Sequence, residues 1–254
     1  MAKILVENDG PVRTIILNRP TARNALDLEG SAMLHQAFRD FENDEQASVA
    51  VVCGAGSAFC AGADLNEMAE KGAVYSPWAG TDGLLARPLS KPLLAAVEGH
   101  AVAGGLGIAL YCDMRIASET AVFGYFCRRF GVPGSDGSTV RLPRLIGIGR
   151  ALDMLNTGRA VDAHEAKAIG LADRVEPEGQ ARSAAERLAR TMAELPQAAL
   201  LADRWSALGQ QGMSLADALN AEAQGAEHAK RSGAQAGAAR FADGAGRGGE
   251  ANRS

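Results

Sequence analysis

The stretch "PLLAAVEGHAVAGGLGIALYCD", Pro92 to Asp113, changes character halfway along. Its first half, "PLLAAVEGHAV", is typical of a strand buried on both faces. Its second half has the apolar continuity of a buried helix. Between them, Gly104, Gly105 and Gly107 fall within four positions, although each glycine costs a helix roughly 1 kcal/mol relative to alanine. The stretch therefore predicts an α/β core in which something closely approaches bare backbone.

The preceding and following segments continue this alternation of strands and helices. "KILVE" and "VRTIIL" flank the turn residues "NDGP" and predict a hairpin. "SVAVVCG" predicts another buried strand, and "MRIASETAVFG" predicts two short ones. Leu28, Leu34, Phe38 and Phe41 form a helical stripe, with Asn24 as a possible N-cap. Strands alternating with helices indicate right-handed crossovers in an α/β sheet.

The chain becomes mainly helical from about Gly147. "DAHEAKAIG" predicts a helix capped by Asp162 and ended by Gly170, and "LADRV" predicts a brief strand. Three more helices are expected after it. We therefore expect a core over residues 1–195, followed by a helical region and a Gly/Ala-rich tail over 196–254, whose end is mobile or ordered only against a partner.

Composition limits the function classes. The chain has 254 residues, is 47% hydrophobic and 22% charged, and carries a net charge of −4, which is ordinary for a globular protein. No basic face supports nucleic-acid binding, and no apolar run reaches the roughly 20 residues of a membrane span. Without a secretory signal or a C-x-x-C pair, a cytoplasmic protein with reduced thiols is expected. The four histidines lack metal-ligand spacing.

Two loops that follow buried strands are the candidate functional positions. Residues 61–64, "AGAD", and residues 103–105, "AGG", each precede a predicted helix. Helix N-termini present unpaired N–H groups, so two such donors could converge on one oxygen as an oxyanion hole. Tight packing of helix against strand is the simpler explanation of these small residues. The spacing alone favours packing.

Several motifs occur together in one order: "LNRPTARNALD", "GSAFCAGADLNEM", "KPLLAAVEGHAVAGGLGIALYCDMRIAS", "GSTVRLPRLIG" and "TGRAVDAHEAKAIGLADRV". With them the chain resembles the crotonase superfamily, also called the enoyl-CoA hydratase/isomerase family. The resemblance implies a spiral of ββα units followed by a helical region that builds a homotrimer or a dimer of trimers. It also implies an acyl-CoA thioester as ligand, with coenzyme A as part of the substrate and no separate cofactor.

The same resemblance implies site residues. The N–H groups of Ala63 and Gly104 would form the oxyanion hole, polarise the thioester oxygen and stabilise an enolate. The coenzyme A path would be lined by Arg23, Ala25, Ala61, Asp64 and Leu65. Arg23 could meet a phosphate, which suits a guanidinium, or be a solvated charge at a helix entry.

The chain departs from the family's hydratases where their two glutamates hold water. By position, Gly107 and Cys127 stand in place of those glutamates. Hydration by the two-glutamate mechanism is therefore predicted against. For Cys127, a packing thiol is favoured over a nucleophile. His100 is expected to be packed, and Tyr125, Arg128 and Arg129 to shape the pocket without an assigned chemistry.

Asp136, in "GVPGSDGST", is the remaining candidate acid/base. Some isomerases and a dehalogenase of the family carry a catalytic aspartate in this loop. Alternatively, Asp136 is a cap for a helix that begins near Ser138. Two hypotheses follow: an enzyme with isomerase-like or unassigned acyl-CoA chemistry, or a catalytically impaired acyl-CoA-binding protein. An Asp136 that faces the pocket would favour the enzyme.

Overall fold

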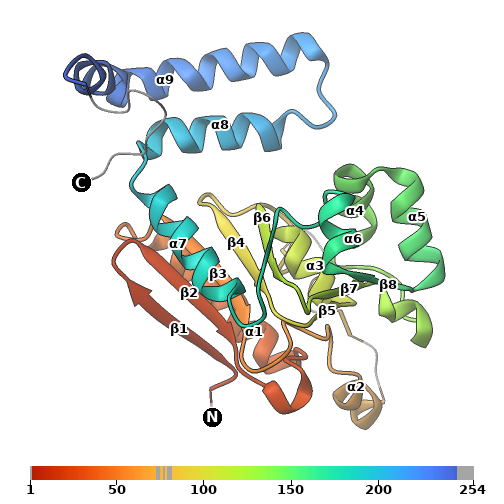
Figure 1. Ribbon diagram of the computed structural model, residues 1–254. Helices are drawn as coiled ribbons and strands as arrows, with labels where there is room; N and C mark the ends of the chain where they lie inside the picture. The colour runs from red at the N-terminus through yellow and green to blue at the C-terminus, as the bar shows by residue number, and fades with distance from the viewer. Residues whose placement is uncertain (1, 73–74, 77, 79–81, 245–254) are drawn as a thin grey trace. The chain divides into compact units, whose positions relative to one another are not determined.

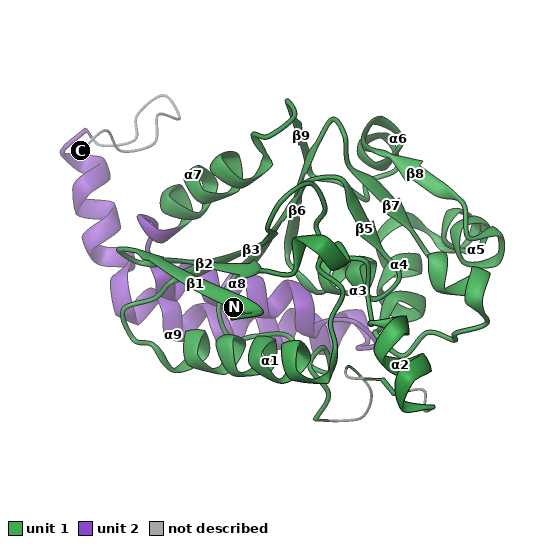
Figure 2. Ribbon diagram, turned by 90° about the horizontal axis from the view of Figure 1, so that it is seen from below, with its two compact units in different colours: residues 1–192 green, residues 193–254 purple. Residues whose placement is uncertain are grey.

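The computed structural model describes residues 2–72, 75–76, 78 and 82–244. The chain divides into two compact units, residues 1–192 and 193–254 (Figure 2). The end of the tail, for which disorder or a partner is expected, lies outside the described residues.

The first unit is built on a twisted, largely parallel sheet. In the described residues its strand order is β1-β2-β3-β4-β6-β9 (Figures 1 and 2). The strands are β1 (Ile4–Asp9), β2 (Val12–Leu17), β3 (Val49–Gly54), β4 (Leu93–Val97), β6 (Met114–Ser118) and β9 (Arg174–Glu176). β1 and β2 form the predicted antiparallel hairpin, and every other neighbouring pair is parallel.

A smaller sheet contains β5 (His100–Val102), β7 (Val122–Gly124) and β8 (Ala160–Asp162), in the order β5-β7-β8. The sequence prediction of one strand over "PLLAAVEGHAV" is therefore wrong, because β4 and β5 belong to different sheets. Gly99 separates them with a φ of +52°, and a Cβ there would lie 2.1 Å from the Ser57 carbonyl oxygen. This left-handed, tightly packed glycine turns the chain from one sheet to the other.

Successive turns of the chain repeat one pattern: a strand of the large sheet, an extended segment beside it, and then a helix. β4 and β5 precede α3 (Gly104–Tyr111) in this way. In the earlier turns of the spiral, an isolated β-bridge takes the place of the extended segment. Leu26 pairs with Ala63 before α1 (Leu28–Asn43), and Cys60 pairs with Ala101 before α2 (Leu65–Lys71). The chain thus winds as a spiral of ββα units, as the resemblance implies.

The remaining elements follow in chain order. They are η1 (Pro20–Ala22), η2 (Phe126–Phe130), α4 (Ser138–Ile146), α5 (Ile148–Thr157), α6 (Ala163–Ala168), α7 (Ala181–Ala193), α8 (Gln197–Gly209) and α9 (Leu215–Ala242). The mainly helical part of the chain, expected from about Gly147, begins with α4 at Ser138, where a helix is also expected from the sequence. Among the described helices, none is long and apolar enough to cross a membrane.

Helix caps test the local predictions. Asp162 caps α6 by accepting from the Glu165 N–H at 2.8 Å, as predicted. The prediction that Asn24 caps α1 is wrong, because Asp27 accepts from the Gly30 N–H at 2.7 Å. Asn24 has a φ of +56°, and its amide donates to the Ala55 and Ala58 carbonyls. Its side chain therefore fixes the loop after β3 instead of a helix end.

The core surrounds the large sheet. α1 and α7 cover opposite faces of its first strands (Figures 1 and 2). On β2, Ile15 belongs to the apolar core that includes Phe38 of α1, whereas the Thr14 hydroxyl donates to Glu186 of α7. Every residue of α3 is buried, which is expected of a helix that is apolar all round. α3 is therefore a fixed support for the loop that precedes it.

Candidate active site

The two candidate loops lie against each other at the start of α3. A Cβ on Gly62 would lie 2.7 Å from the Gly104 nitrogen, and Gly62 has a φ of +95°. The backbone of Cys60 joins the loops further, since its N–H donates to the His100 carbonyl and its carbonyl accepts from the Val102 N–H. The residues before α2 and α3 are thus brought into direct contact, as the oxyanion-hole interpretation requires.

The N–H groups of Ala63 and Gly104 are both available. Hydrogen bonds from the Leu26 N–H to the Gly62 carbonyl and from the Asp64 N–H to the Leu26 carbonyl flank Ala63. Neither the Ala63 N–H nor the Gly104 N–H donates to another residue in the part of the chain that the structure describes. Gly104 is the first residue of α3, where an N–H has no intrahelical acceptor and the helix dipole favours negative charge.

Ala103, directly before this helix, has an unusual backbone conformation. Its φ is +52° and its ψ is −124°, a region that costs a residue with a side chain on the order of 1–3 kcal/mol. Hydrogen bonds hold it there: its N–H donates to the Gly124 carbonyl, and its carbonyl accepts from the Leu106 and Gly107 N–H groups. The surrounding structure therefore imposes the turn that precedes the Gly104 N–H.

The three clustered glycines have three different neighbours. A Cβ on Gly104 would lie 2.4 Å from the buried Trp78 ring, and one on Gly105 would lie 2.0 Å from the Cys60 carbonyl oxygen. A Cβ on Gly107 would lie 2.6 Å from Asp136 Oδ2. Gly105 is therefore closely packed against the Cys60 backbone at the start of α3. Gly107, however, is required by the Asp136 side chain, which occupies the space that a larger residue at position 107 would need.

Asp136 combines the two interpretations that the sequence left open. Its Oδ1 accepts from the Ser138 N–H at 2.9 Å, at the start of α4. Its Oδ2 lies against Gly107, and only 4% of the residue is exposed. Burial raises the pKa of its carboxyl, in spite of the Ser138 hydrogen bond and the nearby Arg141 guanidinium, which favour the charged form. Asp136 therefore faces inward toward α3 while it also supports the N-terminus of α4.

Cys127 and Tyr125 lie close to Asp136. Cys127, on η2, is partly buried and packs against the apolar core. Burial raises the pKa of its thiol, and this opposes a nucleophilic thiolate. Tyr125 is fully buried, and its hydroxyl forms no hydrogen bond of normal geometry with any described residue. The sequence gives Tyr125 no chemistry, and in the fold its hydroxyl lies beside the Cys127 side chain.

The residues expected along the coenzyme A path come from two adjacent segments. The Ala61 N–H donates to the Arg23 carbonyl at 3.0 Å, which places the loop before α2 beside the segment before α1. Ala25 is buried, whereas Arg23 and Leu65 are exposed. The Arg23 guanidinium forms no ion pair with the residues described. The Asp64 carboxylate is occupied structurally, since it caps α2 and pairs with Arg19.

Arg19 was missed by sequence reasoning. Its guanidinium donates to the Ala25 carbonyl at 2.7 Å and to Asp64 Oδ2 at 2.8 Å. It therefore joins the two segments just described. Its position next to Pro20 gives no signal of this role, because its partners follow it at very different separations in the chain.

The other side chains expected around the pocket are structural. The Arg128 and Arg129 guanidinium groups donate to the Leu155 and Gly158 carbonyls, which ties η2 to the end of α5. His100 is partly buried on β5. Among the described residues, no group of three His, Cys, Asp or Glu side chains could hold a metal ion.

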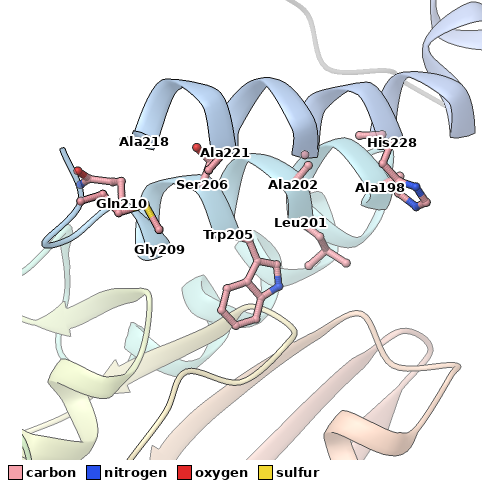
Figure 3. Close-up of a pocket in the computed structure, with 13 residues that line it drawn as sticks. Ala198, Leu201, Ala202, Trp205, Ser206, Gly209, Gln210, Ala218, Ala221 and His228 are labelled. Atoms are coloured by element: carbon pink, nitrogen blue, oxygen red, sulfur yellow. The ribbon is translucent and has the colours of Figure 1, made fainter. Parts of the chain in front are cut away.

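The helical unit has a separate hollow of about 530 Å³ between α8 and α9 (Figure 3). Its lining is mainly apolar, with Leu201, Trp205 and Met213 as the largest apolar side chains. His228 is the one titratable residue among the lining residues. The hollow contains none of the residues described above.

Comparison with known proteins agrees with this geometry. Residues 7–244 match the family model described as Enoyl-CoA hydratase/isomerase. The chain is 42% identical to Enoyl-CoA hydratase EchA19 of Mycobacterium tuberculosis over 193 residues, covering 73% of this chain and 72% of that protein. It is 35% identical to Short-chain-enoyl-CoA hydratase of Clostridium acetobutylicum, with 73% of each chain covered.

Solved structures show the same fold. The crystal structure of an enoyl-CoA hydratase from Mycobacterium tuberculosis superimposes with a TM-score of 0.89 at 32% identity, covering 95% of this chain and 96% of that one. The crystal structure of EchA1 from Mycobacterium marinum gives a TM-score of 0.89 at 31% identity, with the same coverage. The chain has the crotonase fold and belongs to the enoyl-CoA hydratase/isomerase family.

Proposed function

We propose that this chain binds an acyl-CoA thioester and stabilises its enolate, and that Asp136 moves the proton. The thioester oxygen would accept hydrogen bonds from the Ala63 and Gly104 N–H groups, in agreement with the contact between their loops. Donors placed where negative charge develops are a large source of catalysis. Coenzyme A would pass along Arg23, Ala25, Ala61, Asp64 and Leu65, with the exposed Arg23 near a phosphate.

The observation that carries this proposal is the contact between Asp136 and Gly107. Gly107 lies three residues after Gly104, which is about 5 Å along a helix axis. An acyl group whose thioester oxygen is held at Gly104 would therefore bring its α to γ carbons near the Asp136 carboxyl. A single carboxyl with a raised pKa can take a proton from one carbon and return it to another. Double-bond isomerisation is the reaction class that this arrangement supports best.

The test is incubation with a panel of acyl-CoAs in heavy water, with α-carbon deuterium measured by mass spectrometry. We expect exchange with at least one ester of the panel. Measurable coenzyme A ester binding without exchange across the panel would contradict enzymatic function and leave the acyl-CoA-binding protein. That second hypothesis draws its support from Asp136, whose Oδ1 already has a structural role at α4.

Hydration can be tested separately. Relatives named hydratases match this chain, but Gly107 and Cys127 replace the two expected glutamates. We expect the wild-type protein to hydrate a short enoyl-CoA far below a typical enzymatic rate. The variant Gly107→Glu with Cys127→Glu should gain hydration only when Asp136→Gly is added, because even the Asp136 Cβ lies 2.7 Å from a Cβ at position 107. Rapid hydration by the wild-type protein would contradict this account.

We also propose that the protein acts in the cytoplasm and that the helical unit mediates self-association into a homotrimer or a dimer of trimers. Trp205, Leu215 and Leu219 are exposed there, by 43%, 77% and 54%, and large exposed apolar side chains favour an interface. All four cysteines are unpaired, which suits a reducing compartment. Sedimentation velocity tests the assembly, and a purely monomeric protein at micromolar concentration would contradict it.

A further inference from the structure

Asp136 and Arg141 contact one face of α3 at two successive points. The Asp136 side chain lies against Gly107, and the carbon of the Arg141 guanidinium lies 5.4 Å from the centre of the Tyr111 ring. Gly107 and Tyr111 are four residues apart in α3, so they lie about one turn apart on the same face of the helix. The segment that carries Asp136 and Arg141 therefore packs along α3 at both points.

The Arg141 guanidinium joins three parts of the first unit. It donates to the Asp136 carbonyl at 3.2 Å through Nη1 and to the Leu85 carbonyl at 2.5 Å through Nη2. Its distance from the Tyr111 ring is within the roughly 6 Å of a cation–π contact, and the Tyr111 hydroxyl donates to the Arg87 carbonyl at 2.8 Å. The guanidinium thus fixes the backbone of Asp136 to α3 and to the segment that precedes β4.

Gly137 provides the space for this guanidinium. Its φ is +82°, and a Cβ there would lie 1.9 Å from Arg141 Nη1. A residue with a side chain would be strained at position 137 and would also displace the guanidinium. The glycine that directly follows Asp136 is therefore required by the position of Arg141.

The charges around the Asp136 carboxyl leave Arg141 with a defined effect. Burial raises the pKa of this carboxyl, whereas hydrogen bonds at the start of α4 and the charge of Arg141 lower it. Tyr125 and Cys127 also lie near the carboxyl, and burial raises the pKa of both, so both are neutral at pH 7. Arg128, on η2, acts on these two groups. Arg141 therefore favours the ionised form of a carboxyl that burial favours as neutral.

The groups around Arg141 leave its charge available to Asp136. Burial lowers the pKa of the Arg141 guanidinium, but an arginine remains protonated in proteins. The other side chains that act on it are Tyr111 and Cys112 at the end of α3, and Arg144 on α4. Burial raises the pKa of the Cys112 thiol, which is therefore uncharged at pH 7. Of these described groups, Asp136 is the carboxyl.

We propose, on the basis of the proposed function, that Arg141 is a positioning residue for Asp136. Its hydrogen bonds hold the Asp136 backbone so that the carboxyl faces Gly107, and its charge keeps the carboxyl in the ionised form that accepts a proton from the acyl group. Arg141 thus acts through Asp136. Such placement matters for the rate, because a misplacement of about 1 Å can cost on the order of 10²-fold.

Two substitutions separate the two parts of this role. Arg141→Lys keeps the positive charge but replaces the planar fork by a single nitrogen, and Arg141→Gln removes the charge. The pH profile of α-carbon deuterium exchange is measured with 3-butenoyl-CoA in heavy water. Both variants should lower the rate at the high-pH plateau by about 10- to 100-fold. The midpoint of the profile should rise by about 1 pH unit in Arg141→Gln and stay unchanged in Arg141→Lys.

A measurement without substrate follows the Asp136 carboxyl directly. Infrared difference spectra against the Asp136→Asn variant, with isotope-labelled aspartate, give the pH at which this carboxyl titrates. That pH should rise in Arg141→Gln and stay at the wild-type value in Arg141→Lys. Arg144→Gln is the matched control, because it removes the same charge from an exposed position of the same helix. Both the titration and the exchange rate should keep their wild-type values in this control.

The outcomes distinguish this proposal from the proposed function. An Asp136 titration that does not move in Arg141→Gln, or wild-type plateau rates in both variants, would overturn the role of Arg141 and leave the proposed function in place. If Arg141→Gln does not fold, a wild-type plateau rate in Arg141→Lys still overturns that role. A wild-type protein that exchanges no deuterium with 3-butenoyl-CoA or any other ester of the panel would overturn both proposals.

Discussion

In the proposed mechanism, the start of α3 and its first turn differ in what supplies the chemistry. At the start, the Ala63 and Gly104 N–H groups are backbone donors, and the residues there need only be small. One turn later, Gly107 supplies nothing itself and makes room for Asp136, which comes from a distant loop. Under this proposal, local geometry sets the backbone donors, whereas the acid/base side chain comes from another segment and uses the space beside Gly107.

The largest expected effect tests the proposed role of the Asp136 side chain. Asp136→Asn should lower the rate of α-carbon deuterium exchange about 10²- to 10⁴-fold, the usual value of a general acid/base, or about 3–5 kcal/mol in the barrier. The fold should be retained, because the asparagine oxygen can still accept from the Ser138 N–H. Asp162→Asn, at the cap of α6, is the matched control and should exchange at the wild-type rate. An undiminished rate in Asp136→Asn would remove Asp136 from the mechanism.

The next prediction tests whether the position of the backbone N–H donors depends on the close packing at Gly105. Gly105→Ala places a Cβ 2.0 Å from the Cys60 carbonyl oxygen, and backbone cannot move aside cheaply. We expect the free energy of unfolding to fall by about 3 kcal/mol, measured by urea titration. Gly149→Ala is the control within α5, where a Cβ meets nothing within 4 Å, and it should stabilise the protein by up to about 1 kcal/mol. Equal effects of the two substitutions would mean that the loop contact at Gly105 is unimportant.

The third prediction measures the coupling between position 107 and Asp136. Gly107→Ala should destabilise the protein by about 1–3 kcal/mol and slow exchange, because Asp136 must move. The same substitution in an Asp136→Gly background should cost far less, since the atoms that it meets are gone. Urea unfolding of the four proteins gives the coupling energy, for which about 0.5–3 kcal/mol is expected of contacting residues. Additive effects would show that Asp136 does not occupy this space in solution.

The same difference between local geometry and contacts with distant segments explains which features could be predicted from the sequence. Hairpin, buried strands and the Asp162 cap were predictable because each depends on neighbouring residues. The break at Gly99 was missed because it depends on a contact with Ser57. In the site, the pairing of the two glycine-containing loops followed from motif order. The contact of Gly107 with Asp136 could not be predicted, since it depends on how distant segments pack.

The pH dependence of stability gives a smaller effect with a definite sign. Burial raises the folded-state pKa of Asp136 above its unfolded value, which is about 4. Its favourable contribution is therefore fully present below the unfolded pKa and is lost as the pH rises through the folded pKa. Relative to Asp136→Asn, the wild-type protein should lose stability with rising pH, by at most about 1.4 kcal/mol per pH unit. Other carboxyls, such as Asp27 with its lowered pKa, cancel in this difference, which urea titrations from pH 4 to pH 8 can measure. If the difference in the free energy of unfolding did not change with pH, the Asp136 carboxyl would be solvated in the folded protein.

The smallest effect concerns Ala103, which links the two regions. Its φ of +52° and ψ of −124° suit glycine better than alanine. Ala103→Gly should therefore raise the free energy of unfolding by about 1 kcal/mol, offset in part by the greater freedom of the unfolded chain. Because the strained turn presents the Gly104 N–H, the same change should slow deuterium exchange severalfold through a more mobile donor. Ala151→Gly, within α5, is the control and should destabilise the protein without any strain to relieve. If the Ala103→Gly protein were less stable than the wild-type protein, the packing of the Ala103 side chain would contribute more free energy than its backbone strain costs.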